Sequence, residues 1–350
     1  MRIVLFCEQK YAINILNPLH EEADKQGCHE VLWYVHQKNI PEFPLKDQVR
    51  WTNSIQEIYQ FKPEAIFVPC NIVPYYLPGV KAQIFHGYAA EKKDHWIIRR
   101  YFDLYLTQGP YFTQNFSRLA QKYKDFEVVE TGWTKQDWIA AHLHDFEEEK
   151  KKWLTQYNKD KIVLYAPTFS PSMTSLPHIK EGLVRLTREK NILLLLKFHP
   201  LTCQEWVNEY KELAAKEKNI IWIDDHDVTK YELMADVMIS DTSSTVYEVL
   251  LLDKPVITYN TIAKDIYWLD IHNVEDLPEA FEQVQTNEEW ISKRKWIVEN
   301  YDPYLDGQAC KRMIQAVQDY IGKHGVPSKR KLNLWRKYTS IKKFGKINVR

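Results

Sequence analysis

Glycine is scarce in this chain, with only ten among 350 residues. None of them forms the G-x-G-x-x-G pattern, which lets a backbone approach the pyrophosphate of a dinucleotide. The sequence therefore argues against a dinucleotide cofactor.

Cysteine is also sparse and dispersed. The five cysteines are Cys7, Cys28, Cys70, Cys203 and Cys310. They form no C-x-x-C pair and no His/Cys ligand spacing, so we expect a reducing compartment and no zinc. Two short segments, HLHD at 142–145 and DDHD at 224–227, contain metal-ligand residue types, but both also fit polar linkers. We predict no metal site.

Long hydrophobic runs are missing as well. The N-terminus has five consecutive apolar residues, at 3–7, which suits a buried strand and is too short for the core of a signal peptide. No run approaches the roughly 18 apolar residues that a membrane span needs. We therefore expect a cytoplasmic protein.

Net charge is zero, but the charges are unevenly distributed. Residues 323–350 carry ten Lys or Arg and no acid, which leaves 37 basic and 47 acidic residues, a net of −10, in 1–322. Within the tail, apolar side chains recur at helical spacing between the basic ones: Leu334, Tyr338, Ile341 and Phe344. This pattern predicts a basic amphipathic tail at 326–350 that binds an anionic membrane surface. The alternative is a C-terminal helix packed on the first domain. The acidic body argues against nucleic acid.

The rest of the chain alternates short apolar strands with helical patterns, which predicts an α/β protein with parallel sheets covered on both faces. The expected strands are 3–7, 30–36, 65–69, 83–85, 104–107, 127–130, 161–167, 191–198, 219–223, 237–239 and 256–259. The charged stretch 145–153 marks the end of the first series, and helices trail after residue 260. We predict two Rossmann-like domains that face a cleft, an N-terminal domain at 1–150 and a C-terminal domain at 151–325.

The stretch 236–260, DVMISDTSSTVYEVLLLDKPVITYN, reads as strand, polar turn, helix and strand. Ser243 and Ser244 fall at the start of the helix, where free backbone N–H groups and the helix dipole favour an anion. Alternatively, Asp241 and these serines only cap the helix.

Two histidines follow other predicted strands. His86, with Gly87, follows the strand at 83–85 and could act as a general base near neutral pH, while Lys92 follows closely enough to approach a phosphate. Lys197 and His199 end the apolar strand at 191–198, where residues two apart share one face and could contact a phosphate. A loop histidine bonded to backbone, and a polar strand end, are the alternatives.

Two more residues complete the candidate site. Thr168, in the loop after 161–167, offers a hydroxyl to the same cleft, and Lys135 in ETGWTKQD would line the facing wall. Together these residues predict a transfer reaction in which a phosphate-bearing donor lies on the second domain. A base from the first domain would deprotonate an acceptor hydroxyl, and donors from the second would stabilise phosphate charge.

The order of these motifs resembles the CDP-glycerol glycerophosphotransferase family, the teichoic-acid primases and polymerases and capsule-building relatives. The matching motifs are HG at 86–87, APTF at 166–169, KFHP at 197–200, ELMADV at 232–237 and ISDTSSTVYEVLLLDKPVI at 239–257. The resemblance covers about residues 83–260. It implies the glycosyltransferase-B architecture, in which 1–150 is the acceptor-side domain and 151–325 the nucleotide-donor domain. It also implies transfer of glycerol or ribitol phosphate from a CDP-activated donor, with release of CMP.

By position, the resemblance implies roles for individual residues. His86 corresponds to the family's proposed base, and His199 to its second histidine at the donor phosphates. The turn that includes Asp241, Thr242, Ser243 and Ser244 corresponds to the segment at the pyrophosphate, and Glu248 to an acid that can contact the ribose. The chain departs from the family at Ser170, where Arg is common, at Thr242, where Tyr is common, and in the loop EKKDH after HG.

The resemblance further implies a lipid-linked or polysaccharide acceptor and a peripheral position on the cytoplasmic face of the cell membrane. No tightly bound cofactor is implied. Whether the reaction needs a divalent cation such as Mg²⁺ is left open by the sequence. The chain lacks the long extra segment of the polymerases, which suggests a primase-like or single-addition enzyme.

Three other functions fit parts of the pattern. A nucleotide-sugar glycosyltransferase in surface polysaccharide synthesis shares the fold, and its donor would distinguish it. A sugar-nucleotide 2-epimerase would need no basic tail. A nucleotide-binding module without catalysis would need no base at His86.

Overall fold

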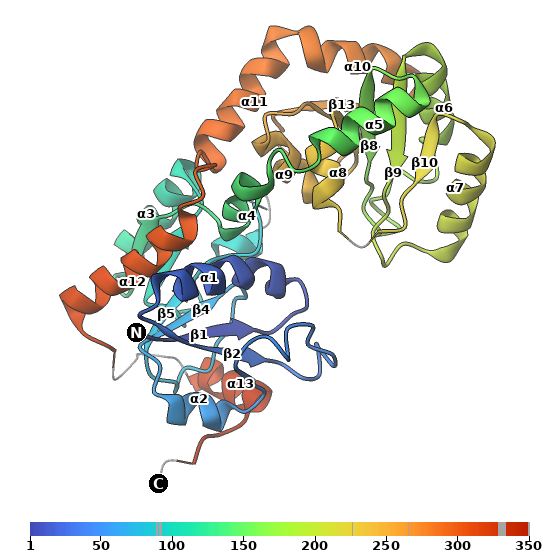
Figure 1. The fold of residues 1–350 in the computed structure, drawn as a ribbon. Coiled ribbons are helices and arrows are strands. Elements are labelled where there is room, and N and C mark those ends of the chain that lie inside the picture. The colour runs from blue at the N-terminus through green and yellow to red at the C-terminus, as the bar shows by residue number, and fades with distance from the viewer. Residues whose placement is uncertain (89, 91–92, 226, 265, 328–333, 349–350) are drawn as a thin grey trace. The chain divides into compact units, whose positions relative to one another are not determined.

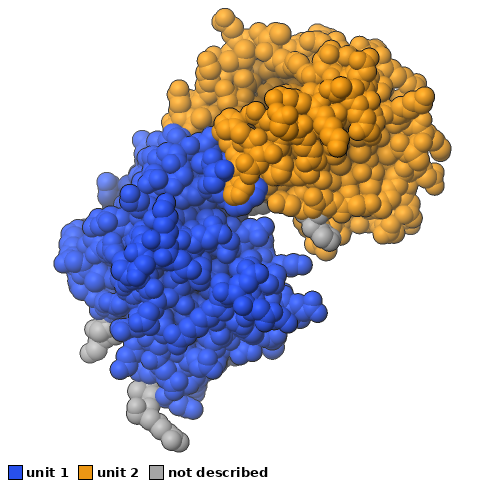
Figure 2. Space-filling view, viewed as in Figure 1, with its two compact units in different colours: residues 1–141, 301–350 blue, residues 142–300 orange. Residues whose placement is uncertain are grey.

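The computed structural model describes residues 1–88, 90, 93–225, 227–264, 266–327 and 334–348. The chain divides into two compact units, residues 1–141 with 301–350 (unit 1) and residues 142–300 (unit 2), coloured separately in Figure 2. The first domain was expected to end at residue 150, but the first stretch of unit 1 ends at residue 141. Residues 301–325, expected in the second domain, instead return to unit 1. The helical pattern of this segment predicts an apolar face but does not say which sheet covers it.

Unit 1 is built on a seven-stranded parallel sheet with the order β3-β2-β1-β4-β5-β6-β7. The strands are β1 (Arg2–Cys7), β2 (Glu30–Val35), β3 (Trp51–Thr52), β4 (Ala65–Val68), β5 (Val80–Gln83), β6 (Leu104–Thr107) and β7 (Glu127–Glu130). The central strands β1 and β4 are buried on both faces. Their sequences are continuous apolar runs because helices cover both sides of a parallel sheet.

Helices cover the two faces of this sheet. They are α1 (Ala12–Gln26), α2 (Ile55–Phe61), the 3₁₀ helix η1 (Lys93–Trp96), α3 (Pro110–Tyr123), α4 (Thr134–His142), α12 (Ala309–His324) and α13 (Leu334–Phe344). Helix α12 packs on α1, whereas α13 lies beside α2 on the opposite side of the sheet (Figure 1). Gln56 near the start of α2 accepts a hydrogen bond from the backbone of Asn348, at 2.8 Å, which fixes that neighbourhood.

Unit 2 is built on a six-stranded parallel sheet with the order β10-β9-β8-β11-β12-β13. The strands are β8 (Lys161–Tyr165), β9 (Ile192–Leu196), β10 (Ile220–Trp222), β11 (Val237–Ser240), β12 (Val256–Tyr259) and β13 (Leu269–Ile271). The helical segments are α5 (Glu147–Tyr157), α6 (Lys180–Glu189), α7 (Gln204–Lys216), α8 (Thr229–Met234), α9 (Thr245–Leu251), η2 (Val274–Asp276), α10 (Leu277–Thr286) and α11 (Glu288–Tyr301). One core of unit 2 joins the strands to α6, α7 and α10 through buried residues such as Leu183, Tyr210 and Phe281.

The predicted class, two Rossmann-like α/β domains, is confirmed. In each sheet the strand order reverses once, between β1 and β4 in unit 1 and between β8 and β11 in unit 2. Loops leave the carboxyl ends of the two central strands in opposite directions at such a point and open a crevice, where α/β proteins bind ligands. The strand order therefore marks one candidate binding edge in each unit.

The C-terminal segment is part of the fold of unit 1. The ring of Phe344 makes an edge contact with Phe6 in β1, with centroids 5.6 Å apart, and Ser340 is fully buried. The hydroxyl of Tyr101 donates to the backbone oxygen of Arg336 at 3.2 Å, and Lys343 forms an ion pair with Glu8. The inner face of α13 therefore packs on the sheet, as the alternative in the sequence analysis predicted.

The outer face of α13 is exposed and apolar at its start. Leu334, Trp335 and Tyr338 are 83%, 74% and 57% exposed. Residues 328–333 and 349–350 of the predicted tail lie outside the described residues. No helix in the described part of the chain combines the length and the apolar character needed to cross a bilayer.

Candidate functional site

His86 lies in an exposed loop at the carboxyl edge of the sheet of unit 1. The expected strand 83–85 is β5 (Val80–Gln83), so His86 follows the strand by three residues instead of one. Its Nδ1 lies 3.1 Å from the backbone oxygen of Pro69, at the end of β4. A carbonyl oxygen only accepts, so Nδ1 carries the hydrogen and Nε2 of the neutral ring keeps its lone pair. This is the form that a general base requires.

The backbone around His86 is held in an unusual conformation. Phe85 has a φ of +59° and Gly87 a φ of +148°, both in the region that disfavours a Cβ. The Phe85 ring is buried, stacked on His95 at 5.1 Å and packed on Phe116 at 5.0 Å between centroids. Aromatic packing therefore stabilises the strained backbone of Phe85, and the next residue, His86, is directed toward solvent.

Other predicted residues of unit 1 are less informative. Lys92 lies outside the described residues. Lys135 is half-buried in the first turn of α4. Tyr11 was not predicted, yet its half-exposed ring lies 5.6 Å from the ring of His86, between centroids.

In unit 2, Asp241 and Thr168 lie at the reversal of the strand order. Asp241 follows β11 and is 1% exposed. One carboxylate oxygen accepts from the backbone N–H of Thr168 at 2.8 Å, and the other accepts from the backbone N–H of Ser175 at 2.8 Å and from its hydroxyl at 2.9 Å. Burial raises the pKa of Asp241, and these hydrogen bonds oppose the rise. The geometry assigns Asp241 to anchoring the loop 166–179, which we call the donor loop.

The next residues form the predicted polar turn. Thr242 accepts from the backbone N–H of Ile262 at 3.2 Å, and the hydroxyls of Ser243 and Thr245 are 2.8 Å apart. Ser244 is exposed and immediately precedes α9, and its side chain makes no capping hydrogen bond. The simple capping alternative is therefore not what the structure shows for Ser244. Glu248, one turn into α9, is half-buried.

Lys197 and His199 follow β9, which ends at Leu196, so the expected extended strand through 198 is too long. Lys197 is 5% exposed and its ammonium group donates to the backbone oxygen of Phe198 at 3.1 Å. The pKa of Lys197 is lowered by burial. The carboxylates of Asp225, Asp227 and Asp224 oppose this shift but do not cancel it.

His199 is exposed and stacks on Phe169, with centroids 4.4 Å apart and the planes 28° apart. Its Nδ1 accepts from the backbone N–H of Leu201 at 3.1 Å, so the hydrogen of the neutral ring is on Nε2. Burial and the charge of Lys197 lower the pKa of His199. The tautomer is thus the reverse of that at His86. His199 presents a hydrogen-bond donor, whereas His86 presents an acceptor.

The segments with metal-ligand residue types have other partners. The side chain of Asp227 accepts from the backbone N–H of Thr229 at 2.9 Å, which starts α8 as the linker alternative predicted. His144 pairs with Glu147 at 2.5 Å. Among the residues that the structure describes, no three His, Cys, Asp or Glu side chains come together as metal ligands.

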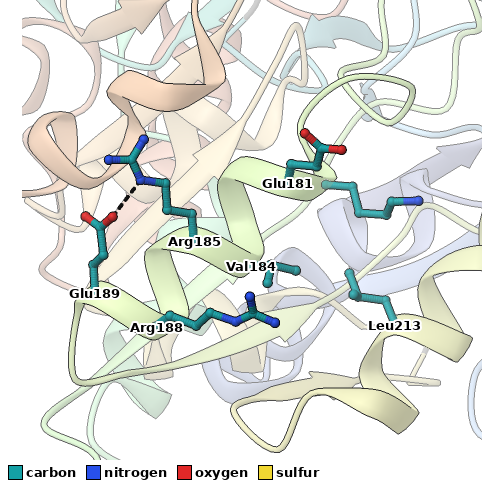
Figure 3. A pocket seen from close by; sticks show the side chains of 7 residues that line it. Glu181, Val184, Arg185, Arg188, Glu189 and Leu213 are labelled. Carbon is teal, nitrogen blue, oxygen red and sulfur yellow. Dashed lines mark hydrogen bonds and ion pairs between the residues drawn. The ribbon is translucent and has the colours of Figure 1, made fainter.

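A cavity of about 370 Å³ lies along the outer side of α6 and α7 (Figure 3). Its apolar lining includes Val184 and Leu213, and its rim carries charged side chains such as Arg185, which pairs with Glu189. None of the predicted site residues lines this cavity. It is therefore separate from the donor loop and the polar turn.

Residues 75–267 match the model of the family described as CDP-glycerol:poly(glycerophosphate) glycerophosphotransferase. The teichoic acid glycerol-phosphate primase of Bacillus subtilis is 26% identical over 240 residues, which are 62% of this chain and 58% of the primase. The teichoic acid ribitol-phosphate polymerase TarL of Staphylococcus aureus is 28% identical over 163 residues, 44% of this chain and 27% of TarL. The chain thus spans less than two thirds of the length of these two relatives.

Solved structures resemble the whole fold. The wall teichoic acid polymerase TagF superposes with a TM-score of 0.65 at 18% identity, over 92% of this chain and 89% of that chain. A UDP complex of MnaA from S. aureus gives a TM-score of 0.68 at 14% identity, over 95% of this chain and 99% of that chain. At these identities the likeness establishes the fold alone.

Proposed function

Because this chain belongs to the CDP-glycerol:poly(glycerophosphate) glycerophosphotransferase family, we propose that it moves glycerol phosphate, or a related polyol phosphate, from a CDP-activated donor to an acceptor hydroxyl. The acceptor is a lipid-linked or polysaccharide precursor in teichoic acid or capsule synthesis, and CMP is released. The relatives with the names teichoic acid primase and teichoic acid polymerase support this substrate class.

The observation that carries the proposal is the opposite protonation of the two exposed histidines. The oxygen of Pro69 holds the hydrogen of His86 on Nδ1, which leaves Nε2 to take a proton. The N–H of Leu201 occupies Nδ1 of His199, which leaves its Nε2–H to donate to a phosphate oxygen. A reaction that removes a proton from one substrate and adds charge to a phosphate on the other needs one group of each kind.

The step follows from these roles. His86 Nε2 takes the proton of the acceptor hydroxyl as its oxygen attacks the phosphorus that bears the polyol. The new O–P bond forms, the bond from that phosphorus to the bridging oxygen breaks, and the electron pair leaves with CMP. His199 and the backbone N–H groups of the turn at Ser243 and Ser244 stabilise the added charge on the phosphates.

The test is a ligand panel followed by turnover. Ligands that bind only the native state raise the melting temperature by mass action. CDP-glycerol, CDP-ribitol or CMP should raise it, and UDP or UDP-sugars should not. A shift with UDP compounds alone would replace the proposal with a nucleotide-sugar glycosyltransferase.

Turnover then tests the base. His86→Ala should reduce CMP release by a factor of 10² to 10⁴, as loss of a general base does, while the CDP-glycerol shift stays unchanged. His144→Ala, which removes another exposed histidine, is the matched control. Wild-type rates in His86→Ala would remove the base assignment.

We also propose that the exposed start of α13 contacts the anionic cytoplasmic face of the membrane. Leu334, Trp335 and Tyr338 supply an apolar and aromatic surface, and exposed basic residues such as Lys342 lie on the same helix. Since α13 also covers Phe6, substitutions on its exposed face are a cleaner test than deletion of the tail. Replacing the three residues with Ser should reduce sedimentation with phosphatidylserine vesicles, whereas Leu201→Ser, at another exposed apolar site, should not. Equal sedimentation of all proteins would remove the membrane proposal.

The reaction is proposed to need no tightly bound cofactor, with a divalent cation as the open case. CMP release measured before and after chelation with EDTA, and after addition of Mg²⁺, decides this point.

A further inference from the structure

Tyr88, two residues beyond His86, is tied into the interior of unit 1. It is 2% exposed, and its hydroxyl donates to a carboxylate oxygen of Asp302 at 2.8 Å. The side-chain amide of Gln136, in α4, donates to the same hydroxyl at 3.2 Å. The ring of Tyr88 packs edge-on against Trp133, with centroids 5.1 Å apart.

Asp302 connects three segments that are distant in sequence. It is 3% exposed and follows α11, where the chain re-enters unit 1. One oxygen accepts from Tyr88 and from the backbone N–H of Trp133 at 3.0 Å, and the other accepts from the backbone N–H of Tyr304 at 3.3 Å. Burial raises the pKa of Asp302, and these donors oppose the rise. A buried carboxyl group with this set of donors fixes their positions, because a buried donor left without its acceptor destabilises the fold.

The residue between the base and Tyr88 is held in the same way. Gly87, whose φ of +148° lies in a region that residues with a Cβ rarely adopt, accepts a hydrogen bond at its backbone oxygen from the side chain of Gln108, at 2.8 Å. Gln108 is fully buried at the end of β6. The exposed imidazole of His86 is therefore followed by two residues that are anchored in the interior.

We propose that Tyr88 and Asp302 are positioning residues for His86. Their hydrogen bond fixes the turn after β5, so that Nδ1 of His86 stays on the oxygen of Pro69 and Nε2 keeps its lone pair. Asp302 touches neither substrate and moves no proton. The role of Asp302 in catalysis rests on the proposed function of His86. The effect of Asp302 on the imidazole of His86 does not depend on that function.

The first experiment measures the imidazole itself. In the full chain labelled with ¹⁵N-histidine, long-range ¹H–¹⁵N spectra report which ring nitrogen carries the hydrogen. We expect the Nδ1–H form for His86 in the wild type. Tyr88→Phe removes one hydroxyl and keeps the ring packing, and should convert His86 to a mixture of both forms. Tyr304→Phe is the matched control, because it removes the hydroxyl that donates to Glu130 at 2.6 Å from the same returning segment. Identical His86 spectra in wild type and Tyr88→Phe would overturn the proposal.

The second experiment measures turnover. Tyr88→Phe should lower kcat for CMP release about 10- to 100-fold, as a misplaced catalytic group does, with the KM for the CDP-activated donor unchanged. Asp302→Ala should behave like Tyr88→Phe, and Asp302→Asn, which keeps an oxygen acceptor, should restore most of the rate. Equal rates in Tyr88→Phe, Tyr304→Phe and wild type would overturn the positioning role.

The two experiments separate the two proposals. A wild type that releases no CMP, but in which Tyr88→Phe changes the His86 tautomer, would overturn the proposed reaction and retain the positioning of His86. A wild type that releases CMP, together with a Tyr88→Phe variant of equal rate and equal His86 spectrum, would retain the proposed reaction and overturn the positioning of His86.

Discussion

The carboxylate of Asp241 accepts the backbone N–H of Thr168 at 2.8 Å, and this bond joins the ends of the two strands between which the sheet of unit 2 reverses its order. The same side chain receives two hydrogen bonds from Ser175. The donor loop is therefore held at the crevice where an α/β sheet binds its ligand. A carboxylate that is fully used in this way contributes shape to the site and is not itself a phosphate ligand.

Replacement of Asp241 should therefore affect both stability and donor binding. Asp241→Ala leaves the buried N–H of Ser175 and the partly buried N–H of Thr168 without an acceptor, and we expect the free energy of unfolding to fall by about 1–3 kcal/mol. The thermal shift with CMP or CDP-glycerol should shrink. Asp160→Ala, at an exposed acid just before β8, is the control for urea unfolding and for ligand shifts. Wild-type stability in Asp241→Ala would show that the loop is held by other contacts.

His199 gives a second prediction. His199→Ala removes the Nε2–H donor and should weaken binding of CDP-glycerol, measured by titration calorimetry, by a factor of about 10 or more, since a hydrogen bond to a charged group is worth about 1.5–3 kcal/mol. Phe169, on which His199 stacks, provides the contrast. Phe169→Leu removes the stacking and keeps the donor, so its loss should be the smaller one. An unchanged affinity in His199→Ala would exclude a phosphate contact from this residue.

His95 predicts a pH dependence of stability. Burial, with a smaller effect from His86, lowers the pKa of His95 to about 4, and its Nε2 is buried without a hydrogen-bond partner. Between pH 6.5 and 4 the unfolded chain binds a proton at this residue and the native state does not. The free energy of unfolding therefore falls as pH falls, by up to about 1.4 kcal/mol per pH unit from this group.

The matching variant is His95→Phe, which preserves the stacking on Phe85 and cannot take up a proton. Urea unfolding at several values between pH 7.5 and 4.5 should show a smaller acid loss in His95→Phe than in the wild type. His144→Ala, at an exposed histidine, should keep the wild-type slope. Parallel curves for all three proteins would mean that His95 is protonated equally in the folded and unfolded states.

Phe344 tests whether the C-terminal helix belongs to the fold. Phe344→Ala removes the edge contact with Phe6 and should lower the free energy of unfolding by about 1–3 kcal/mol, less than for a fully buried ring because Phe344 is half-buried. Trp335→Ser, on the exposed side of the same helix, should leave stability within about 0.5 kcal/mol of the wild type. If both variants unfolded like the wild type, α13 would contribute no packing energy to unit 1.

The elements with continuous apolar runs could be predicted from the sequence. Strands such as β1 and β9 are buried on both faces, so nearly every residue in them is apolar, and their existence follows from composition over five or six residues. The two-residue strand β3 and the three-residue strand β13 were not predicted. They form at the ends of their sheets by pairing with β2 and β12, and strands this short carry no periodic signal.

Residue types at short spacing were enough to predict the local chemistry: two parallel α/β units, a histidine after β5, a second histidine after β9, and a polar turn before α9. These depend on residue types at short spacing, which the sequence displays directly. Which ring nitrogen of each histidine carries its hydrogen could be seen only in the folded chain, because it depends on the oxygen of Pro69 and the N–H of Leu201. Folding also brought Asp302 to Tyr88, 214 positions apart, and returned the C-terminal segment to unit 1. Such pairs form only when the sheet of a unit packs with its own helices and connections, and no spacing within one segment encodes them.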